Sequence, residues 1–311
     1  MKKHLSIGTR GSALALAQAT LVQQQIIKRH PHLSVDLEII KTTGDKIQDV
    51  PLAKIGGKGL FTKEIELAIL AGEVDLGVHS MKDVPTDVPD GLVIGITTLR
   101  EDPRDAFISR KYRSLEEIPA RGRIGTGSLR RKAQLLHRHP DVEIVPLRGN
   151  VDTRLRKLTE ENLDAVILAT AGLRRLGRAG EITAIIPETE MLPAIGQGAL
   201  GLEYRQDDLV TQGILEFLDD PETKVAVAAE RAFLARLEGG CQVPIAAKGS
   251  LHNGRLVLDG LIGDLTGARI YREQVTGHPD EAVALGQHLA ETLLKRGGAQ
   301  ILSEIYGRVF H

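Results

Sequence analysis

The chain has 311 residues, 42% of them apolar, which is enough for two or three domains at roughly 150 residues each. Its 40 Lys and Arg residues against 41 Asp and Glu residues give a net charge of −1, which argues against a basic nucleic-acid-binding protein and against an acidic disordered one. One cysteine cannot form an internal disulfide, no apolar run follows Lys2 and Lys3, and no segment approaches the roughly 20 apolar residues that span a bilayer. We therefore expect a cytoplasmic protein that interacts with no membrane.

The charge is unevenly distributed along the chain. Residues 1–120 carry 16 basic and 16 acidic side chains, residues 121–178 carry 13 and 6, and residues 179–311 carry 11 and 19, so the three segments have net charges of 0, +7 and −8. A basic middle segment favours a multiply charged anion as ligand. Chance clustering of basic residues on a solvated face is the alternative.

The first two-thirds of the chain alternates short apolar runs with helical segments. Strands are predicted at His4–Gly8, Val35–Lys41, Val74–His79, Leu92–Thr97, Arg123–Gly125, Val142–Pro146 and Ala165–Ala169. Helices are predicted at Ser12–Arg29, Thr62–Ala71, Ser128–His139 and Asn150–Thr159, with Pro31, Gly72 and Pro140 as stop signals. This alternation predicts α/β layers.

The pattern changes from about Asp219. A long helix is predicted at Glu222–Leu237, followed by three strands near 244–251, 255–262 and 268–276 and a helix from about Pro279 to Arg296. Grouped strands with flanking helices indicate a separate, smaller α+β domain.

A weak internal repeat links the two α/β regions. Gly8-Thr9-Arg10-Gly11-Ser12 and Gly125-Thr126-Gly127-Ser128 each join a predicted strand to a predicted helix. A helix N-terminus at the carboxyl end of a strand favours anion binding, and two copies in one chain suggest related halves. Since serine is also a common N-cap residue, a purely structural role remains open.

Arginines gather where predicted strands end and helices begin. A guanidinium group can bind a carboxylate or phosphate through two parallel hydrogen bonds, so these arginines suit a ligand with several carboxylates, although each alone could form a surface ion pair. They are Arg10, Arg130, Arg131, Arg148, Arg154, Arg174 and Arg175. Only nine aromatic residues occur in the chain, too few to favour stacking on nucleic-acid bases.

Asp83 follows an apolar strand that turns polar at its end, in His79-Ser80-Met81-Lys82-Asp83-Val84-Pro85. A carboxylate at a loop mouth can act as a general acid or base or stabilise a developing cation. A loop cap or a pair with Lys82 is the alternative.

Two further segments are candidates for a functional role. Gly56-Gly57-Lys58-Gly59 lacks the spacing of a phosphate-binding loop and fits a mobile lid with cationic side chains better. Cys241, the single thiol, lies between Gly239-Gly240 and Pro244 on a predicted loop, where it could be a nucleophile or an attachment point instead of an inert buried side chain. No metal-ligand spacing occurs, so no metal site is expected.

Several motifs in a fixed order make the chain resemble the porphobilinogen deaminase family, whose members are also called hydroxymethylbilane synthases. The resemblance runs from Ile7 to about Lys248. Its motifs are Gly-Thr-Arg-Gly-Ser (8–12), Lys-Thr-Thr-Gly-Asp (41–45), Gly-Gly-Lys-Gly-Leu-Phe (56–61), His-Ser-Met-Lys-Asp-Val-Pro (79–85), Gly-Thr-Gly-Ser-Leu-Arg-Arg (125–131), Arg-Gly-Asn-Val-Asp-Thr-Arg (148–154) and Gly-Gly-Cys-Gln-Val-Pro (239–244).

The resemblance implies two α/β domains like the halves of a type II periplasmic binding protein and a smaller C-terminal α+β domain. Domain 1 would comprise residues 1–98 and 195–216, domain 2 residues 99–194, and domain 3 residues 217–311 with the cofactor cysteine. It also implies a monomer that condenses four molecules of porphobilinogen head-to-tail, with loss of ammonia, on a dipyrromethane primer. Hydrolysis then releases linear hydroxymethylbilane.

The same resemblance assigns roles to individual residues. Asp83 would be the essential acid, and Cys241 would hold the dipyrromethane cofactor by a thioether. Residues that would hold the carboxylates of cofactor and substrate are Arg10, Ser12, Ser80, Lys82, Thr126, Ser128, Arg130, Arg131, Arg148, Arg154 and Arg175. Lys54, Lys58 and Phe61 would belong to a flexible loop over the cleft. The rival hypothesis is a non-catalytic, two-lobed carboxylate-binding protein of the cytosol, which would not need Cys241.

Overall fold

The computed structural model describes residues 2–46, 59–240 and 243–310, and these separate into two compact units. The first unit comprises the described residues within 1–50, 57–101 and 198–224, and the second those within 102–197 and 225–311. No helix in the described ranges is long and apolar enough to cross a membrane.

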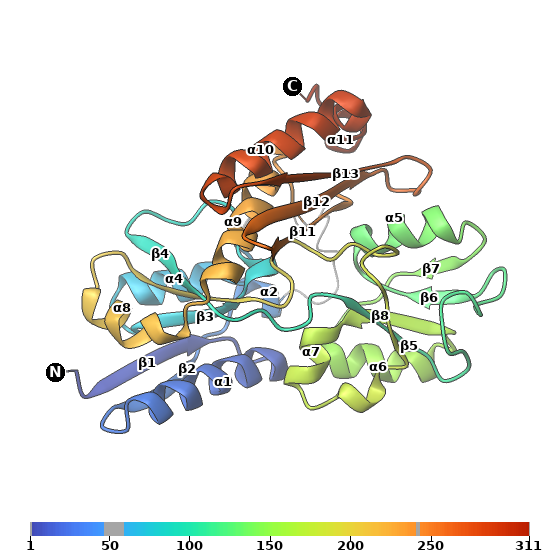
Figure 1. Ribbon diagram of the computed structural model, residues 1–311. Helices are drawn as coiled ribbons and strands as arrows, with labels where there is room; N and C mark the ends of the chain where they lie inside the picture. Colours follow the sequence, from blue (N-terminus) through green and yellow to red (C-terminus); the bar gives the residue numbers. More distant parts are fainter. Residues whose placement is uncertain (1, 47–58, 241–242, 311) are drawn as a thin grey trace. The chain divides into compact units, whose positions relative to one another are not determined.

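The first unit is built on a five-stranded sheet in the order β2-β1-β3-β10-β4 (Figure 1). Its strands are β1 (His4–Thr9), β2 (Ser34–Ile39), β3 (Leu76–Ser80), β4 (Leu92–Thr97) and β10 (Leu200–Arg205). Its helices are α1 (Ala13–Arg29), α2 (Thr43–Lys46), α4 (Lys63–Leu70), the 3₁₀ turn η1 (Met81–Asp83), α8 (Leu209–Leu215) and the 3₁₀ turn η3 (Glu216–Leu218). Strands β1, β2 and β3 run parallel, whereas β10 is antiparallel to β3 and β4.

The second unit contains a sheet of the same design, in the order β7-β6-β8-β5-β9. Its strands are β5 (Asp105–Ile108), β6 (Arg123–Gly125), β7 (Glu143–Val145), β8 (Ala165–Ala169) and β9 (Ala184–Ile185). Its helices are α5 (Leu129–Arg138), α6 (Val151–Glu160), α7 (Thr170–Arg175) and the 3₁₀ turn η2 (Ala179–Glu181). Here too three strands are parallel and the fourth, β5, is antiparallel to both neighbours. The two sheets therefore share one topology, as the internal repeat predicts.

A three-stranded antiparallel sheet, β11-β12-β13, forms the C-terminal part of the second unit. The strands are β11 (Ile245–His252), β12 (Arg255–Gly263) and β13 (Ile270–Gly277). The helices of this part are η4 (Pro279–Glu281), α10 (Ala282–Leu293), the π turn η5 (Leu294–Gly298), α11 (Ala299–Tyr306) and α9 (Pro221–Arg236), of which residues 225–236 belong to the second unit. Helix α10 lies along β12 and β13 (Figure 1), and Phe233, Leu258 and Leu289 are fully buried in the core between them. Gly286 lets α10 approach α9 closely, because a Cβ there would lie 2.2 Å from the carbonyl oxygen of Ala229.

The predicted α/β class with a smaller α+β part is confirmed by these three sheets. All the predicted strands and helices are present, with ends shifted by a few residues. Strands β5, β9 and β10 and helices α2, α7 and α8 were not predicted. The predicted C-terminal helix was also incomplete, because the backbone breaks at Gly297 (φ 123°) and α11 then continues to Tyr306.

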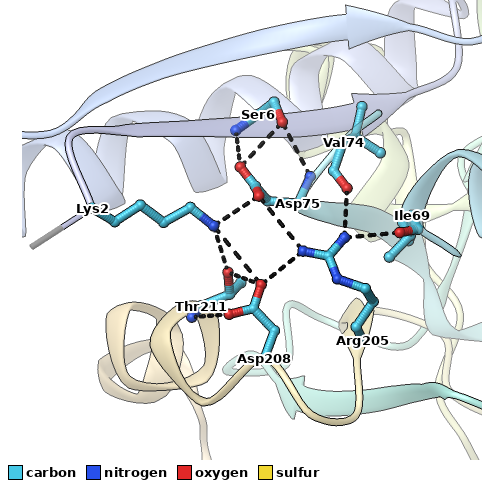
Figure 2. Close-up of polar contacts among 8 residues, drawn as sticks. All are labelled: Lys2, Ser6, Ile69, Val74, Asp75, Arg205, Asp208 and Thr211. Carbon is cyan, nitrogen blue, oxygen red and sulfur yellow. Dashed lines mark hydrogen bonds and ion pairs between the residues drawn. The ribbon is translucent and has the colours of Figure 1, made fainter. Parts of the chain in front are cut away.

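A network of charged side chains closes one edge of the first sheet (Figure 2). Asp75 precedes β3 and accepts hydrogen bonds from Lys2 Nζ at 2.7 Å and from the Ser6 backbone N–H at 2.8 Å. Arg205, at the end of antiparallel β10 and hence at the same edge, donates to Asp208 at 2.9 Å. The network ties together the start of β1, the start of β3 and the end of β10. It lies at the edge opposite to the carboxyl ends of β1 and β3.

Replacing Asp75 with Asn should lower the free energy of unfolding by about 1.5–3 kcal/mol, because the part-buried carboxylate accepts charged and backbone hydrogen bonds. Urea unfolding measures the change. The control is Asp36→Asn, which breaks the exposed pair with His4 and should change stability by less than about 0.5 kcal/mol. Equal losses in the two variants would contradict this account of the network.

Candidate functional site

Polar side chains from three separate segments of the first unit line one pocket. Strands β1 and β3 are parallel neighbours, so their carboxyl ends lie at the same edge of the sheet. The pocket has a volume of about 50 Å³ and is lined by Arg10, Ser12, Leu14, Ala15, Gln18, Phe61, Thr62, Val78, His79, Ser80 and Asp83. The structure therefore brings together five predicted site residues that are up to 73 positions apart in the sequence.

Three contacts fix side chains at the pocket. The guanidinium carbon of Arg10 lies 4.0 Å from the centroid of the Phe61 ring, a cation–π contact. The amide of Gln18 donates a hydrogen bond of 2.8 Å to Ser80 Oγ. Ser12 caps α1, since its hydroxyl accepts a hydrogen bond from the Ala15 N–H.

Asp83 occupies the last position of η1 and is exposed, while Lys82 beside it is half-buried. The chain passes directly from β3 into this 3₁₀ turn, and the Val84 N–H donates to the Met81 carbonyl oxygen at 3.3 Å. A short turn that starts at a buried strand gives the carboxylate a defined place at the pocket while leaving it accessible to a reactant.

The second unit repeats the strand-to-helix connection at β6 and α5. Thr126 is buried, and Ser128 caps α5 by accepting a hydrogen bond from the Arg131 N–H. Gly127 permits a close approach, because a Cβ there would lie 2.4 Å from the carbonyl oxygen of Leu147. The capped helix N-terminus is favourable for an anion.

Arg130 and Arg131 differ from the loop-end arginines that the sequence suggested. Both are buried in the first turn of α5, and both bind Asp105, at the start of β5. Arg130 Nη1 lies 2.8 Å from one carboxylate oxygen and Arg131 Nη2 lies 2.7 Å from the other. Gln197 adds a third donor to the same carboxylate at 2.9 Å.

The carboxylate of Asp105 is fully buried and ionised in this arrangement. Burial alone would raise its pKa, but the charges and hydrogen bonds of Arg130 and Arg131 hold the pKa well below the usual range of an aspartate. Two guanidinium charges against one carboxylate leave a net positive charge at the start of α5. The group can thus attract an anion even though Asp105 engages both arginines.

Of the other predicted arginines of this unit, Arg148, Arg154 and Arg175 are half-buried, whereas Arg174 is exposed. Arg148 and Arg154 flank Asn150, the N-cap of α6, and Arg154 Nε donates to the Gly149 carbonyl oxygen at 2.9 Å. Gly149 has φ of 104°, a conformation that glycine adopts readily. Arg175 lies in the last turn of α7.

Lys54, Lys58 and Cys241 lie outside the described residues. Within the ranges that the structure describes, no group of three or more His, Cys, Asp or Glu side chains is arranged to hold a metal ion.

Sequence analysis missed several residues of these sites. In the pocket of the first unit they are Gln18, Thr62 and His79, and in the second unit they are Asp105 and Gln197. An aspartate that opens an apolar run, as in Asp105-Ala-Phe-Ile, was the available signal, because a charged residue next to a buried strand usually has a partner.

Comparisons with known proteins agree on one family. The model of the family domain described as "Porphobilinogen deaminase, dipyromethane cofactor binding domain" matches residues 5–213, and that of "Porphobilinogen deaminase, C-terminal domain" matches residues 224–295. The chain is similar to the porphobilinogen deaminase of Trichlorobacter lovleyi, with 56% identity over 98% of each chain. It is also similar to that of Geobacter sulfurreducens, with 55% identity over 98% of this chain and 95% of the relative.

Among solved structures, a crystal structure of the methionine binding protein MetQ is similar. The TM-score is 0.43 and the identity 16%, with coverage of 70% of this chain and 89% of that one.

Replacing Asp105 with Asn should lower the free energy of unfolding at pH 7 by about 3–5 kcal/mol, because it leaves two buried guanidinium groups without a counter-charge. The pKa of Asp105 is lowered in the folded state, so its contribution is fully present above the unfolded pKa of about 3.9. It is lost as the pH falls below that value. Urea unfolding at several pH values should show the difference from wild type shrinking in acid.

Glu160→Gln serves as the control, since the pair of Glu160 with Arg156 is exposed and should contribute less than about 0.5 kcal/mol. A difference between Asp105→Asn and wild type that stayed constant with pH would show that the Asp105 charge is not responsible.

Proposed function

The chain belongs to the porphobilinogen deaminase family, and from this premise we propose that it is a transferase that condenses four porphobilinogen molecules and releases linear hydroxymethylbilane. Its relatives are enzymes of tetrapyrrole synthesis that match nearly the full chain at about 55% identity, and the two family domains cover most of it. The non-catalytic carboxylate-binding protein is not favoured by these matches.

The pocket of the first unit carries the chemical part of the proposal. It presents the exposed carboxyl of Asp83 beside the cationic Arg10 and the hydroxyl of Ser80. We assign to Asp83 the transfer of a proton to the leaving amine of porphobilinogen. Positive charge develops on the substrate as ammonia leaves, and the same carboxylate stabilises it electrostatically.

Arginines hold the carboxylates of the growing chain in this proposal. Each pyrrole unit brings two carboxylates, so a product of several units needs many cationic donors. In the first unit Arg10, Ser12, Ser80 and Lys82 supply donors. In the second unit we assign this role to Thr126, Ser128, Arg130, Arg131, Arg148, Arg154 and Arg175.

Arg130 and Arg131 act in part through their charge. Asp105 occupies Nη atoms of both, but Arg131 Nε is buried and has no hydrogen-bond partner among the described residues. One net positive charge and the N-terminus of α5 together favour an anionic group.

Dipyrromethane is the cofactor named for the family domain that matches residues 5–213. The guanidinium and hydroxyl donors of both units fit a group that carries carboxylates, so the residues present suit it. When bound, the cofactor supplies the primer pyrroles to which substrate units are added. We propose Cys241 as its attachment point through a thioether.

Several further features belong to the proposal. We propose Lys54, Lys58 and Phe61 as parts of a loop over the substrate, and porphobilinogen as the small-molecule partner. A monomeric state, a cytoplasmic location and three domains with boundaries near residues 98, 195 and 217 remain predictions from the sequence.

Asp83→Asn should separate binding from chemistry. The amide keeps the shape of the side chain but cannot protonate an amine or offset a developing cation, so kcat should fall by about 10² or more while substrate affinity changes little. Steady-state kinetics, together with a mass series of trapped enzyme–substrate adducts, measures both effects.

Arg148→Ala is the matched comparison. It removes donors to a carboxylate at a cost of about 1.5–3 kcal/mol, so the loss should appear as weaker substrate affinity that depends on salt. The assignment would be contradicted if Asp83→Asn bound substrate weakly with normal turnover while Arg148→Ala bound it normally with slow turnover. Asp83 would then serve in binding and Arg148 in the chemical step.

The intact mass should exceed that of the 311-residue chain by two pyrrole units, and the excess should survive unfolding because a thioether is covalent. Cys241→Ala should lose both the excess mass and turnover, and its melting temperature should fall because the arginines lose their anionic partner. An active preparation of unmodified mass would refute the covalent cofactor, whereas an inactive preparation of unmodified mass would favour the binding-protein alternative.

A further inference from the structure

Three ionisable side chains are buried next to the pocket of the first unit, and the proposed reaction does not use them. They are His79 on β3, Glu203 on β10 and Glu66 on α4. The side chains of His79 and Glu203 are 4% and 2% exposed, and Glu66 is also buried. We call these three residues the His79 cluster.

The sheet register brings the members of the His79 cluster together. His79 Nε2 lies 2.9 Å from Glu203 Oε2. In the antiparallel pair of β3 and β10, Glu203 is opposite Gly77, which lies two residues before His79 and so on the same face of β3. A Cβ at Gly77 would lie 2.7 Å from His79 Nε2, so the glycine makes room for the imidazole ring.

Stability alone is a poor explanation for ionisable side chains at this place. Ile65, Ile69 and Val74 are buried beside the cluster, as is the polar residue Thr62. A buried ion pair generally contributes no more stability than apolar residues of the same size would. Burial raises the pKa of Glu66 and the neighbouring Glu203 acts in the same direction, whereas the Thr62 side chain and the nearby His79 oppose the rise. Removing such polar groups from water carries a desolvation cost.

The cluster adjoins the residues proposed for catalysis. His79 lines the same pocket as Ser80 and Asp83. The chain passes from His79 through Ser80 directly into the turn Met81–Asp83. A ring fixed on one side by Glu203 and seated over Gly77 therefore fixes the last residues of β3 before that turn.

We propose that His79 is a positioning residue. Its hydrogen bond to Glu203 holds the end of β3 so that the Met81–Asp83 turn presents the Asp83 carboxyl at the pocket in its working orientation. The inference rests on the proposed role of Asp83 and deepens it. It explains the desolvation cost of these buried polar groups by the placement of the carboxyl, for which an error of about 1 Å can reduce the rate by up to 10².

Substitution of Glu203 tests this role. Glu203→Leu removes the partner of His79 and should lower kcat by at least about tenfold while KM stays within about twofold. Glu203→Gln keeps the size and a hydrogen-bonding group, so it should recover most of the lost kcat. Gly77→Ala keeps every ionisable group but displaces the ring, and should lower kcat by about fivefold or more. It decides the question if Glu203→Leu does not fold.

Asp75→Asn is the matched control for stability. Asp75 directly precedes the first residue of β3, in the network of Figure 2, and so lies at the end of the strand opposite to His79. Replacing Asp75 should lower the melting temperature without changing kcat. Intact mass verifies that every variant carries the same covalent cofactor, so that a fall in kcat is not a loss of cofactor.

The outcomes are distinct. A kcat within twofold of wild type in Glu203→Leu, or in Gly77→Ala where that variant decides, overturns the inference. A fall in kcat of Asp75→Asn as large as that of Glu203→Leu also overturns it, since any weakening of the sheet would then suffice. Asp83→Asn in the same assay separates the two proposals. An inactive Asp83→Asn with an active Glu203→Leu refutes only the positioning role, whereas a fully active Asp83→Asn refutes the role of Asp83 itself.

Discussion

The parallel pairing of strands is the constraint on which both candidate sites depend. Parallel neighbours end at the same sheet edge, so the residues that follow β1 and β3 meet although they are about 70 positions apart. The opposite edge of the first sheet differs, because Lys2 and Arg205 there both form ion pairs with Asp75. The charged side chains at the Asp75 edge thus form ion pairs. The edge at the carboxyl ends of β1 and β3 presents polar groups at a pocket. The same sheet topology in the second unit puts Thr126 and Ser128 at the corresponding position.

Part of the positive charge counted in residues 121–178 is buried and not available at the surface. The segment 121–178 has a net charge of +7, but Arg130 and Arg131 share the carboxylate of Asp105, which lies outside that segment in sequence. Part of the apparent cationic surface is therefore internal, and it ties β5 to α5. The remaining single positive charge of the group acts together with the helix N-terminus, where the orientation of the peptide dipoles favours anions.

Local signals explain which elements the sequence could predict. Ser12 and Ser128 cap their helices, and Pro31 and Pro140 follow the ends of the same helices, so these boundaries needed no tertiary information. Strands β5 and β10 pair antiparallel with strands distant in the sequence, and β10 contains the buried Glu203 within its apolar run. The family motifs indicated Arg10, Ser80 and Asp83, but only the fold shows that Gln18 and His79 line the same pocket.

Two glycines show why part of the site could not be predicted from hydrophobic patterning. Gly77 is opposite Glu203 and Gly201 is opposite His79 in the pairing of β3 with β10, so each large polar residue faces a residue without a side chain. A Cβ at Gly201 would lie 2.3 Å from Met81 Sδ, at the residue that begins the turn carrying Asp83. The space left by these two glycines accommodates both the His79 ring and the start of the turn. Hydrophobic patterning identifies the positions that carry apolar side chains. The placement of Asp83 depends here on two glycines, which carry no side chain.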